Sequence, residues 1–421
     1  MTPRPALATR IVLTCFLLAL ALWIGLGMKL FVMALLSEFL GVALASTLII
    51  HLRIRPYLSD LLLVLAATAL LSVIMFWTLE LKLSFKVALA FLGLSSFGVM
   101  AIRLVWLQGE ERKFLFWGFV PALLFSGSLW LYPPLLKLSK VIWPETLDRF
   151  LYSFDASLHF QPSFLLGMVF WRWHWLYNLS VGFYLSLPVV IALVYVENLR
   201  RRREDALSVL FSLLLLGPLG WICYNCFPAC GPIHLFHADF PFHALSFAQA
   251  RELQLIPVAV NSERNAIPSL HMAWVLIAWW YAKGQAWWVK LVALAFLVFT
   301  VMATLGTGEH YFIDLIVAFP FTLMVRALFC YALPWKNRER QVALLTGLSG
   351  TFLWFGLLRY AMPFFWISPA IPWAFVVATI AIVQFRKNCL LRAADFQRLV
   401  SSSAPESLLP TVEEPISVVG D

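Results

Sequence analysis

An apolar run that follows four arginines sets the fold class of this chain: RRRREDALSVLFSLLLLGPLGWICYN, residues 200–225. Its part 207–225 has no charged side chain, and about 20 mostly apolar residues suffice to cross the hydrocarbon core of a bilayer. The whole chain of 421 residues is 62% hydrophobic and 13% charged, whereas soluble proteins have about 25% charged residues. We therefore predict an all-α, polytopic integral membrane helical bundle.

Twelve segments have the length and apolarity of a membrane span. The signals are weakest for the first pair, which could instead form one hairpin, and for the short segment 269–283. We interpret residues 11–28 as an uncleaved anchor rather than a signal peptide, because bulky apolar residues continue beyond Ala21. The predicted spans are residues 11–28, 31–50, 61–79, 86–107, 115–136, 174–196, 207–225, 269–283, 288–306, 312–334, 341–359 and 371–385.

Short loops rich in arginine and lysine mark the cytoplasmic side of a membrane protein. Residues 200–203 form such a loop, and counting spans from it in both directions places the other basic segments and both termini on the same side. The loops that bear the histidine clusters then face the periplasmic, extracellular or luminal side. Because topology accounts for the basic residues, we expect no nucleic acid partner.

The distribution of polar residues predicts five regions. Residues 1–136 form a five-span bundle without concentrated polar chemistry. Residues 137–166 form an interfacial segment with the spacing of an amphipathic helix. Residues 167–334 hold a catalytic core, residues 335–398 a two-span extension, and residues 399–421 a cytoplasmic tail whose serine, proline and glutamate content predicts disorder. The sequence indicates no function for the first five or the last two spans.

Two clusters that contain histidine carry the chemistry: NAIPSLH at residues 265–271 and GEHYFID at residues 308–314. His310 and Asp314 are one helical turn apart, so the carboxylate can orient the imidazole and stabilise its charged form. His271 follows Ser269 at a predicted helix start, where a serine caps exposed amides and a phosphate is favoured. One histidine can attack phosphorus, while the other protonates the leaving oxygen and later activates an acceptor.

A metal site is not expected from the cysteines. Cys223, Cys226 and Cys230 cluster at the outer end of one predicted span, but no fourth ligand of matching type lies nearby. We expect no cofactor either.

The first cluster, with Pro268, Ser269, Leu270 and His271, resembles the second motif of the type 2 phosphatidic acid phosphatase superfamily. Gly308, His310, Tyr311 and Asp314 resemble its third motif. Leu270, and the four-residue ladder of Tyr224, Pro228 and Pro232, are similar to the inositolphosphotransferase branch, which includes inositol phosphorylceramide synthases. The resemblance covers roughly residues 164–334.

This resemblance implies a six-helix catalytic core that needs no metal. His310 would be the nucleophile that forms a phosphohistidine, Asp314 its orienting partner, and His271 the general acid and base. The resemblance is incomplete, because Ala303 and Thr304 stand where the phosphatase motif has a serine and an arginine. The lysine and arginine of the first phosphatase motif have no counterpart.

Without these basic residues, another group must balance the negative charge of the phosphate. The candidates are Arg264 and Arg251, each weighed against being a solvated loop charge, together with backbone amides at a helix start. Both arginines lie in the long outer loop 226–268, and long loops are often lids or binding loops. The full set of predicted substrate-binding residues is Arg264, Arg251, Ser269, Tyr224, Gly308 and Tyr311.

Three functions remain open. The first is a metal-independent phosphotransferase that moves a phospho-headgroup, such as inositol phosphate, from a phospholipid donor to a lipid alcohol acceptor such as ceramide. The second is a lipid phosphate or isoprenoid diphosphate phosphatase that uses the same histidines with water as acceptor. The third is a transporter or scaffold, for which an internal repeat would be expected, and none is evident. Whether an accessory membrane subunit takes part is left open.

Overall fold

A computed structural model describes residues 14, 38–54, 56–79 and 85–403 of the chain. The predicted span 11–28 apart from residue 14, residues 31–37 of the predicted span 31–50, and residues 404–421 of the predicted tail lie outside this part. About 79% of the described residues are helical, as the sequence predicted for an all-α protein, and their only strands form one two-stranded sheet.

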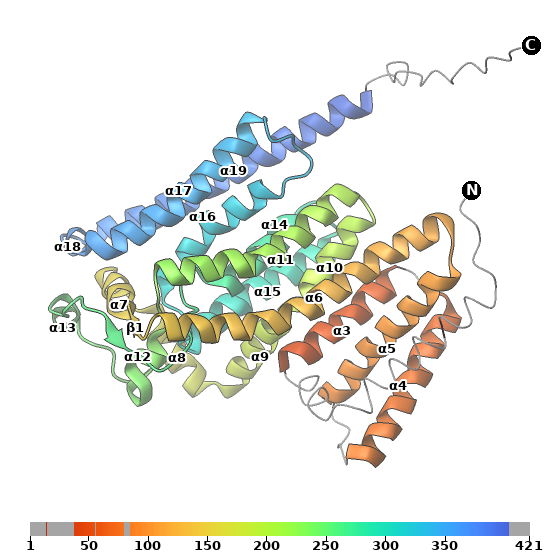
Figure 1. Cartoon of the computed structure of the whole chain (residues 1–421). Coiled ribbons are helices and arrows are strands. Elements are labelled where there is room, and N and C mark those ends of the chain that lie inside the picture. Colours follow the sequence, from red (N-terminus) through yellow and green to blue (C-terminus); the bar gives the residue numbers. More distant parts are fainter. Residues whose placement is uncertain (1–13, 15–37, 55, 80–84, 404–421) are drawn as a thin grey trace, which may run out of the picture.

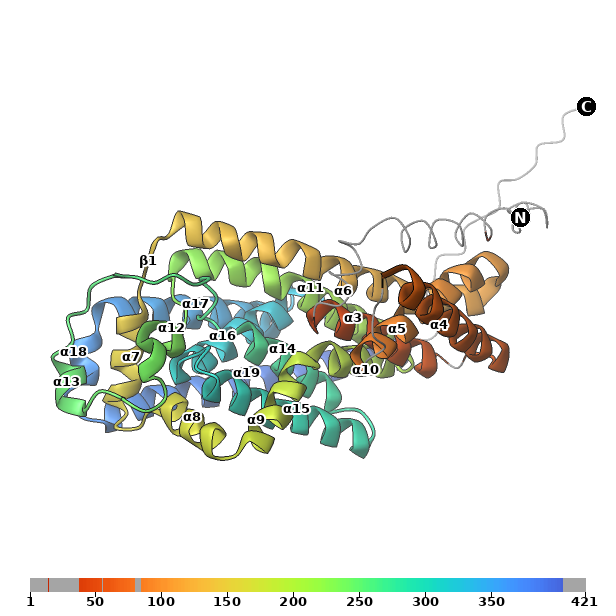
Figure 2. The ribbon, with the colours of Figure 1, turned by 90° about the horizontal axis from the view of Figure 1, so that it is seen from below.

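The N-terminal helices gather at one end of the molecule (Figure 1). One of them, α6, is much longer than its neighbours and runs on from this end to the opposite one, beside α11 (Figure 2). The group joins the rest of the chain through α10, where Glu197 accepts a hydrogen bond from Arg53 Nε at 2.6 Å. Its helices are α3 (Glu38–Arg53), α4 (Leu58–Leu79), α5 (Phe85–Trp106) and α6 (Gly109–Ile142).

The central helices share one large apolar core. They are α7 (Asp148–Ser157), α8 (Pro162–Arg172), α9 (His174–Leu185), α10 (Leu187–Leu199), α11 (Arg203–Cys226), α14 (Leu270–Ala282), α15 (Trp287–Gly306) and α16 (Phe312–Leu328). The outer loop between α11 and α14 holds α12 (Pro232–Phe236), the short helix η1 (His237–Asp239), α13 (Phe247–Arg251) and β2 (Val258–Ala259). Strand β2 pairs antiparallel with β1 (Glu145–Thr146), which ties this loop to the end of α6. Three C-terminal helices follow: α17 (Arg338–Tyr360), α18 (Met362–Phe365) and α19 (Ala370–Ser403).

Six of the described helices are long and apolar enough to cross a membrane: α4, α5, α11, α15, α17 and α19. A seventh span results if α9 and α10 count as one, although they meet at an angle of 48° where a single span over residues 174–196 was predicted. Pro188 in the first turn of α10 explains the break, because a proline at this position lacks the amide that would continue a helix from α9. The chain is therefore a membrane protein by composition and helix length, and the number of twelve spans is not confirmed.

Helix α7, in the segment predicted to be an interfacial amphipathic helix, lies inside the protein. All of its residues except Arg149 are buried, including Asp148 and Asp155. It packs among α13, α16, α17 and α18. The charged residues that gave α7 an amphipathic pattern find hydrogen-bond partners inside the protein, so the pattern did not report exposure to water. At the other end of the chain, α19 continues as a helix through Ser403, into the first residues of the predicted tail.

The C-terminal helices pack closely on the central helices where α17 runs along α16 (Figure 1). At Gly347 of α17 the two backbones approach so closely that a Cβ atom would lie 2.6 Å from the carbonyl oxygen of Pro320, and it would also clash with the amide nitrogen of Met324. Backbone atoms cannot move aside as a flexible side chain can, so glycine is required here.

We predict that Gly347→Ala destabilises the protein by about 1 to 3 kcal/mol, the usual cost of overpacking. Gly356→Ala, on the same helix, is the matched control, because a Cβ there meets no atom within 4 Å. Thermal unfolding of both variants in detergent checks this expectation. Equal melting temperatures for the two variants would show that α17 does not pack on α16 in this way.

Candidate active site

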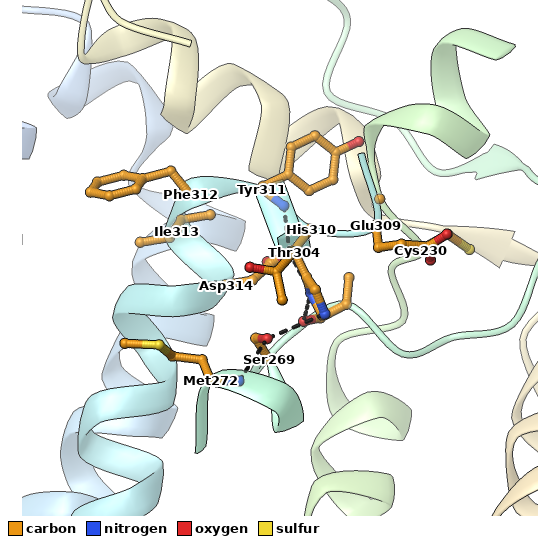
Figure 3. Close-up of polar contacts among 12 residues, drawn as sticks. Cys230, Ser269, Met272, Thr304, Glu309, His310, Tyr311, Phe312, Ile313 and Asp314 are labelled. Atoms are coloured by element: carbon orange, nitrogen blue, oxygen red, sulfur yellow. Dashed lines mark hydrogen bonds and ion pairs between the residues drawn. The ribbon is translucent and has the colours of Figure 1, made fainter. Parts of the chain in front are cut away.

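The fold brings the two histidine clusters together (Figure 3). His310 lies two residues before α16, and His271 lies in the first turn of α14. The centroids of their rings are 6.4 Å apart. Ser269 caps the start of α14 by accepting a hydrogen bond from the amide of Met272, as the sequence predicted. The amide of Ser269 in turn donates to the carbonyl of Asp314 at 3.1 Å, which joins the starts of the two helices.

The two ring nitrogens of His310 have different surroundings. Nδ1 lies 2.9 Å from the carbonyl oxygen of Ala266 and 3.4 Å from Oδ2 of Asp314. Because a carbonyl oxygen only accepts hydrogen bonds, Nδ1 carries the hydrogen, and Nε2 keeps its lone pair. Nε2 lies 3.2 Å from the hydroxyl of Ser269, which can donate to it. This is the tautomer that a nucleophilic histidine needs, with the attacking nitrogen held at a defined position.

Asp314 is completely buried. Its Oδ2 accepts a hydrogen bond from the amide of Tyr311 at 2.8 Å and lies beside Nδ1 of His310. Its Oδ1 has no hydrogen-bond partner among the described residues. The carboxylate is therefore positioned to stabilise a positively charged imidazole when His310 reacts.

His271 is held by an aromatic neighbour. Its Nδ1 lies 3.0 Å from the hydroxyl of Tyr184, and the two rings stack with centroids 4.0 Å apart. The ring of Trp274 meets His271 edge-on at 5.4 Å. These contacts fix the plane of the imidazole, so its other nitrogen can exchange a proton with a bound group.

Both histidines line a cavity of about 820 Å³, which is large enough for a lipid headgroup and the start of its chains. Its walls come from α6, α8, α9, α11, α14, the end of α15, the connection between α15 and α16, and the outer loop, and most of the lining is apolar and aromatic. Glu263 and Glu309 also line it, but no lysine or arginine does among the residues that the structure describes. His271, His310 and a third lining histidine, His174, are therefore the candidates for positive charge on the cavity wall.

Three other predicted substrate-binding residues occupy different places. Tyr224 is buried and lines the cavity. Gly308, with φ +77°, lies so close to Phe240 that a Cβ would be 2.8 Å from its ring, so it allows tight packing of the outer loop. Tyr311 does not line the cavity, and its hydroxyl donates instead to Asp148 at 3.1 Å.

The structure does not bring either predicted arginine to the cavity lining. Arg251 is exposed on α13. Arg264 is 1% exposed, and its guanidinium donates to the carbonyl groups of Trp143 at 2.8 Å and Pro144 at 2.7 Å. It also donates to the carbonyls of Val260 and Ser262 in its own loop. With its donors engaged in this way, Arg264 fastens the outer loop to the end of α6.

Sequence reasoning missed an ionic pair at the cavity. Nε2 of His234 lies 3.5 Å from Oε2 of Glu309, the residue that precedes His310. The hydrogen bond to Glu309 raises the pKa of His234, although burial opposes this. Burial favours a higher pKa for Glu309, but the hydrogen bond from His234 and the attraction to the His234 and His310 rings together outweigh it, so that pKa is lowered. The position of Glu309 beside His310 was visible in the sequence, whereas its partner, 75 residues earlier in the outer loop, was not.

The comparison with known families bears on this region of the chain. Residues 149–328 match the PAP2 superfamily. The matched region runs from α7 to α16 and contains both histidine clusters. Members of this superfamily are typically phosphatases or phosphotransferases, which is the chemistry that two opposed histidines can perform. The match does not distinguish the inositolphosphotransferase branch. No curated protein and no solved structure matches the chain significantly.

We predict that Arg264→Ala lowers stability by about 2 to 4 kcal/mol, because it leaves four buried or partly buried carbonyl groups without their donor. Arg251→Ala is the control and should change neither the melting temperature nor KM. Melting curves and KM of the two variants test the assignment. A stable Arg264→Ala protein whose KM rises tenfold would identify Arg264 as a substrate ligand after all.

The ion pair between His234 and Glu309 makes the free energy of unfolding depend on pH. Because the pKa of His234 is raised in the folded state, the stabilisation is fully present below about pH 6.5 and is lost as the pH rises through the raised value. Solvent screening of this partly exposed pair limits the term to below about 1 kcal/mol. We predict that the melting temperature of the wild type falls between about pH 6 and 8 more than that of His234→Gln. Parallel melting curves over this range would contradict it.

Proposed function

We propose that the protein is a metal-independent lipid phosphotransferase that moves a phospho-headgroup from a phospholipid to a lipid alcohol through a phosphohistidine at His310. The observation that carries this proposal is the state of His310. Its Nδ1 is engaged by the carbonyl of Ala266 beside Asp314, and its Nε2 faces Ser269 at the wall of a cavity that His271 shares. In the orientation that the basic loops predict, this site faces the periplasmic, extracellular or luminal side and both termini are cytoplasmic.

In the first half-reaction, Nε2 of His310 attacks the phosphorus of the donor, a phosphodiester. A bond forms between nitrogen and phosphorus, and the bond from phosphorus to the diacylglycerol oxygen breaks. Protonated His271 gives its proton to this leaving oxygen. Asp314 stabilises the positive charge that develops on the His310 ring.

In the second half-reaction, neutral His271 takes the proton from the hydroxyl of the acceptor lipid. The oxygen attacks phosphorus, the nitrogen–phosphorus bond breaks, and the phospho-headgroup passes to the acceptor. His310 returns to its starting state and His271 is protonated again, so atoms and protons balance over the cycle.

The charges around the cavity favour a diester donor over a phosphate monoester. A monoester or diphosphate brings two or more negative charges at neutral pH, and Glu263 and Glu309 would repel them in a cavity without lysine or arginine in its lining. A diester brings one negative charge, which the two histidines can balance. Carboxylates and the amide oxygen of Asn265, which has no partner among the described residues, can accept hydrogen bonds from a hydroxylated headgroup such as inositol.

The alternative is a lipid phosphatase in which water completes the same covalent reaction, and the family match allows it. The position of the phosphatase arginine argues against it. Thr304 stands there, completely buried, and its hydroxyl donates to the carbonyls of Thr300 and Val301 within its own helix. It offers no charge to a phosphate dianion. The transporter or scaffold alternative assigns no role to the paired histidines.

Transfer of label from phosphatidylinositol, labelled in its phosphate, to ceramide by the purified protein in detergent tests the proposal. We expect transfer by the wild type and a loss of about 10³-fold or more in His310→Ala. His243→Ala is the matched control, because His243 is exposed and outside the cavity lining. Denaturation at alkaline pH without ceramide, where a phosphohistidine is stable, should trap label on the wild type and not on His310→Ala.

Other outcomes would overturn the proposal. Release of phosphate from phosphatidic acid without any transfer to ceramide would establish the phosphatase. Transfer that persists in His310→Ala would exclude the phosphohistidine.

A further inference from the structure

Three buried side chains from α7 and the start of α8 bind the backbone around the catalytic histidine. Asp155 accepts hydrogen bonds from the amides of Phe312 at 2.7 Å and Ile313 at 3.1 Å. Ser163 donates to the carbonyl oxygen of His310 itself, at 2.9 Å. The third is Asp148, described below. All three are at most 3% exposed, and none lines the cavity.

The hydrogen bonds that Asp155 accepts supply partners for backbone amides at the start of α16. The first amides of a helix have no partner within the helix, and a serine, threonine or aspartate just before it commonly accepts from one of them. In α16 this position is Tyr311, whose hydroxyl is bound to Asp148. Asp155 supplies the missing acceptor from another helix. Asp314 therefore does not have to accept from these two amides and can face His310 and the Tyr311 amide.

Asp148 holds the other flank of the same turn. Its carboxylate accepts from the amide of Gly231 at 2.8 Å, from the amide of Cys230 at 3.1 Å and from the hydroxyl of Tyr311. Gly231 has φ +131°, and a Cβ there would lie 2.8 Å from the carbonyl of Gly308. Asp148 thus fixes both the residue that follows His310 and the loop that packs against the residues before it. Asp148 and Asp155 are seven residues apart, which places them on one face of α7.

We propose that α7 is the positioning element of the catalytic histidine and that Asp155 is its principal positioning residue. Asp155 touches no substrate, and it acts by holding the start of α16 and thereby Nε2 of His310 and the carboxylate of Asp314. The proposal rests on the reactive role of His310 but not on the identity of the lipid. A misplacement of reacting groups by about 1 Å can lower a rate by about 10²-fold while binding is little changed.

The experiment compares Asp155→Ala, Asp155→Asn and Ser163→Ala with the control Glu145→Gln, an exposed acid three residues before Asp148. We expect kcat to fall about 10² -fold in Asp155→Ala and about tenfold in Asp155→Asn, which keeps one acceptor oxygen. KM should stay within about twofold of the wild type, and Ser163→Ala should lose about three- to tenfold in kcat. Glu145→Gln should match the wild type in every readout.

A second readout does not depend on the lipid. Vanadate mimics a phosphoryl group under attack by a nucleophile, so its binding to the detergent-purified protein reports on Nε2 of His310. We expect His310→Ala to abolish this binding and Asp155→Asn to weaken it about tenfold, at a melting temperature close to that of the wild type. If Asp155→Ala does not fold, the kcat and the vanadate affinity of Asp155→Asn and Ser163→Ala test the positioning proposal.

Folded Asp155 variants with wild-type kcat, or with wild-type vanadate affinity, would overturn the proposal. So would a loss of kcat that only follows a loss of folded protein. If the wild type transfers no label between the lipids but binds vanadate through His310, the proposed function fails and the positioning proposal is still decided by the vanadate series. If vanadate binding is also independent of His310, both proposals fail.

Discussion

The amides at the start of α16 are the constraint on which the site depends. They begin a helix inside the protein, where an unpaired amide would be costly. The chain meets this need with Asp155, which lies more than 150 residues earlier, and with the side chain of Asp314. Since His310 is the residue before this turn, the bonds that satisfy the helix start also place the imidazole. Burial of α7 follows from the same requirement, because its carboxylates are the acceptors.

The electrostatics of the site follow from this arrangement. Burial raises the pKa of Asp148 and, to a larger extent, that of Asp155, while hydrogen bonds from backbone amides oppose the shift in both. The hydrogen bonds that the structure records for these two carboxylates come from backbone amides and a tyrosine hydroxyl, all of them neutral donors. The substrate side of the cavity has no lysine or arginine in its lining among the described residues. A site of this kind suits a substrate of low charge in which the imidazoles supply most of the positive charge during the reaction.

The sequence predicted the parts of the site that depend on local spacing. His310 and Asp314 share a helix face at one-turn spacing, and Ser269 caps α14 as a serine before a helix does. The helical membrane character also followed directly from composition. What the sequence could not reveal were pairings across long separations. From the sequence, charged residues on α7 and in the outer loop were expected to be exposed. Their partners are backbone groups, and a sequence pattern does not reveal such pairings. Arg264 is the clearest case, since a loop arginine looks the same whether it binds phosphate or four carbonyl groups.

The position of Arg264 also gives the N-terminal helices a part in the site. Pro133 and Leu136 of α6 line the cavity, and the same helix ends at the carbonyls that Arg264 binds. Just beyond, β1 pairs with β2 of the outer loop. One continuous helix therefore connects the N-terminal bundle, one wall of the cavity and the segment that covers it. A displacement of α6 along the bundle would move the wall and the cover together, while α7 holds His310 from the other side. The geometry of the cavity thus depends on how α6 packs against α11, because both helices contribute residues to the cavity wall.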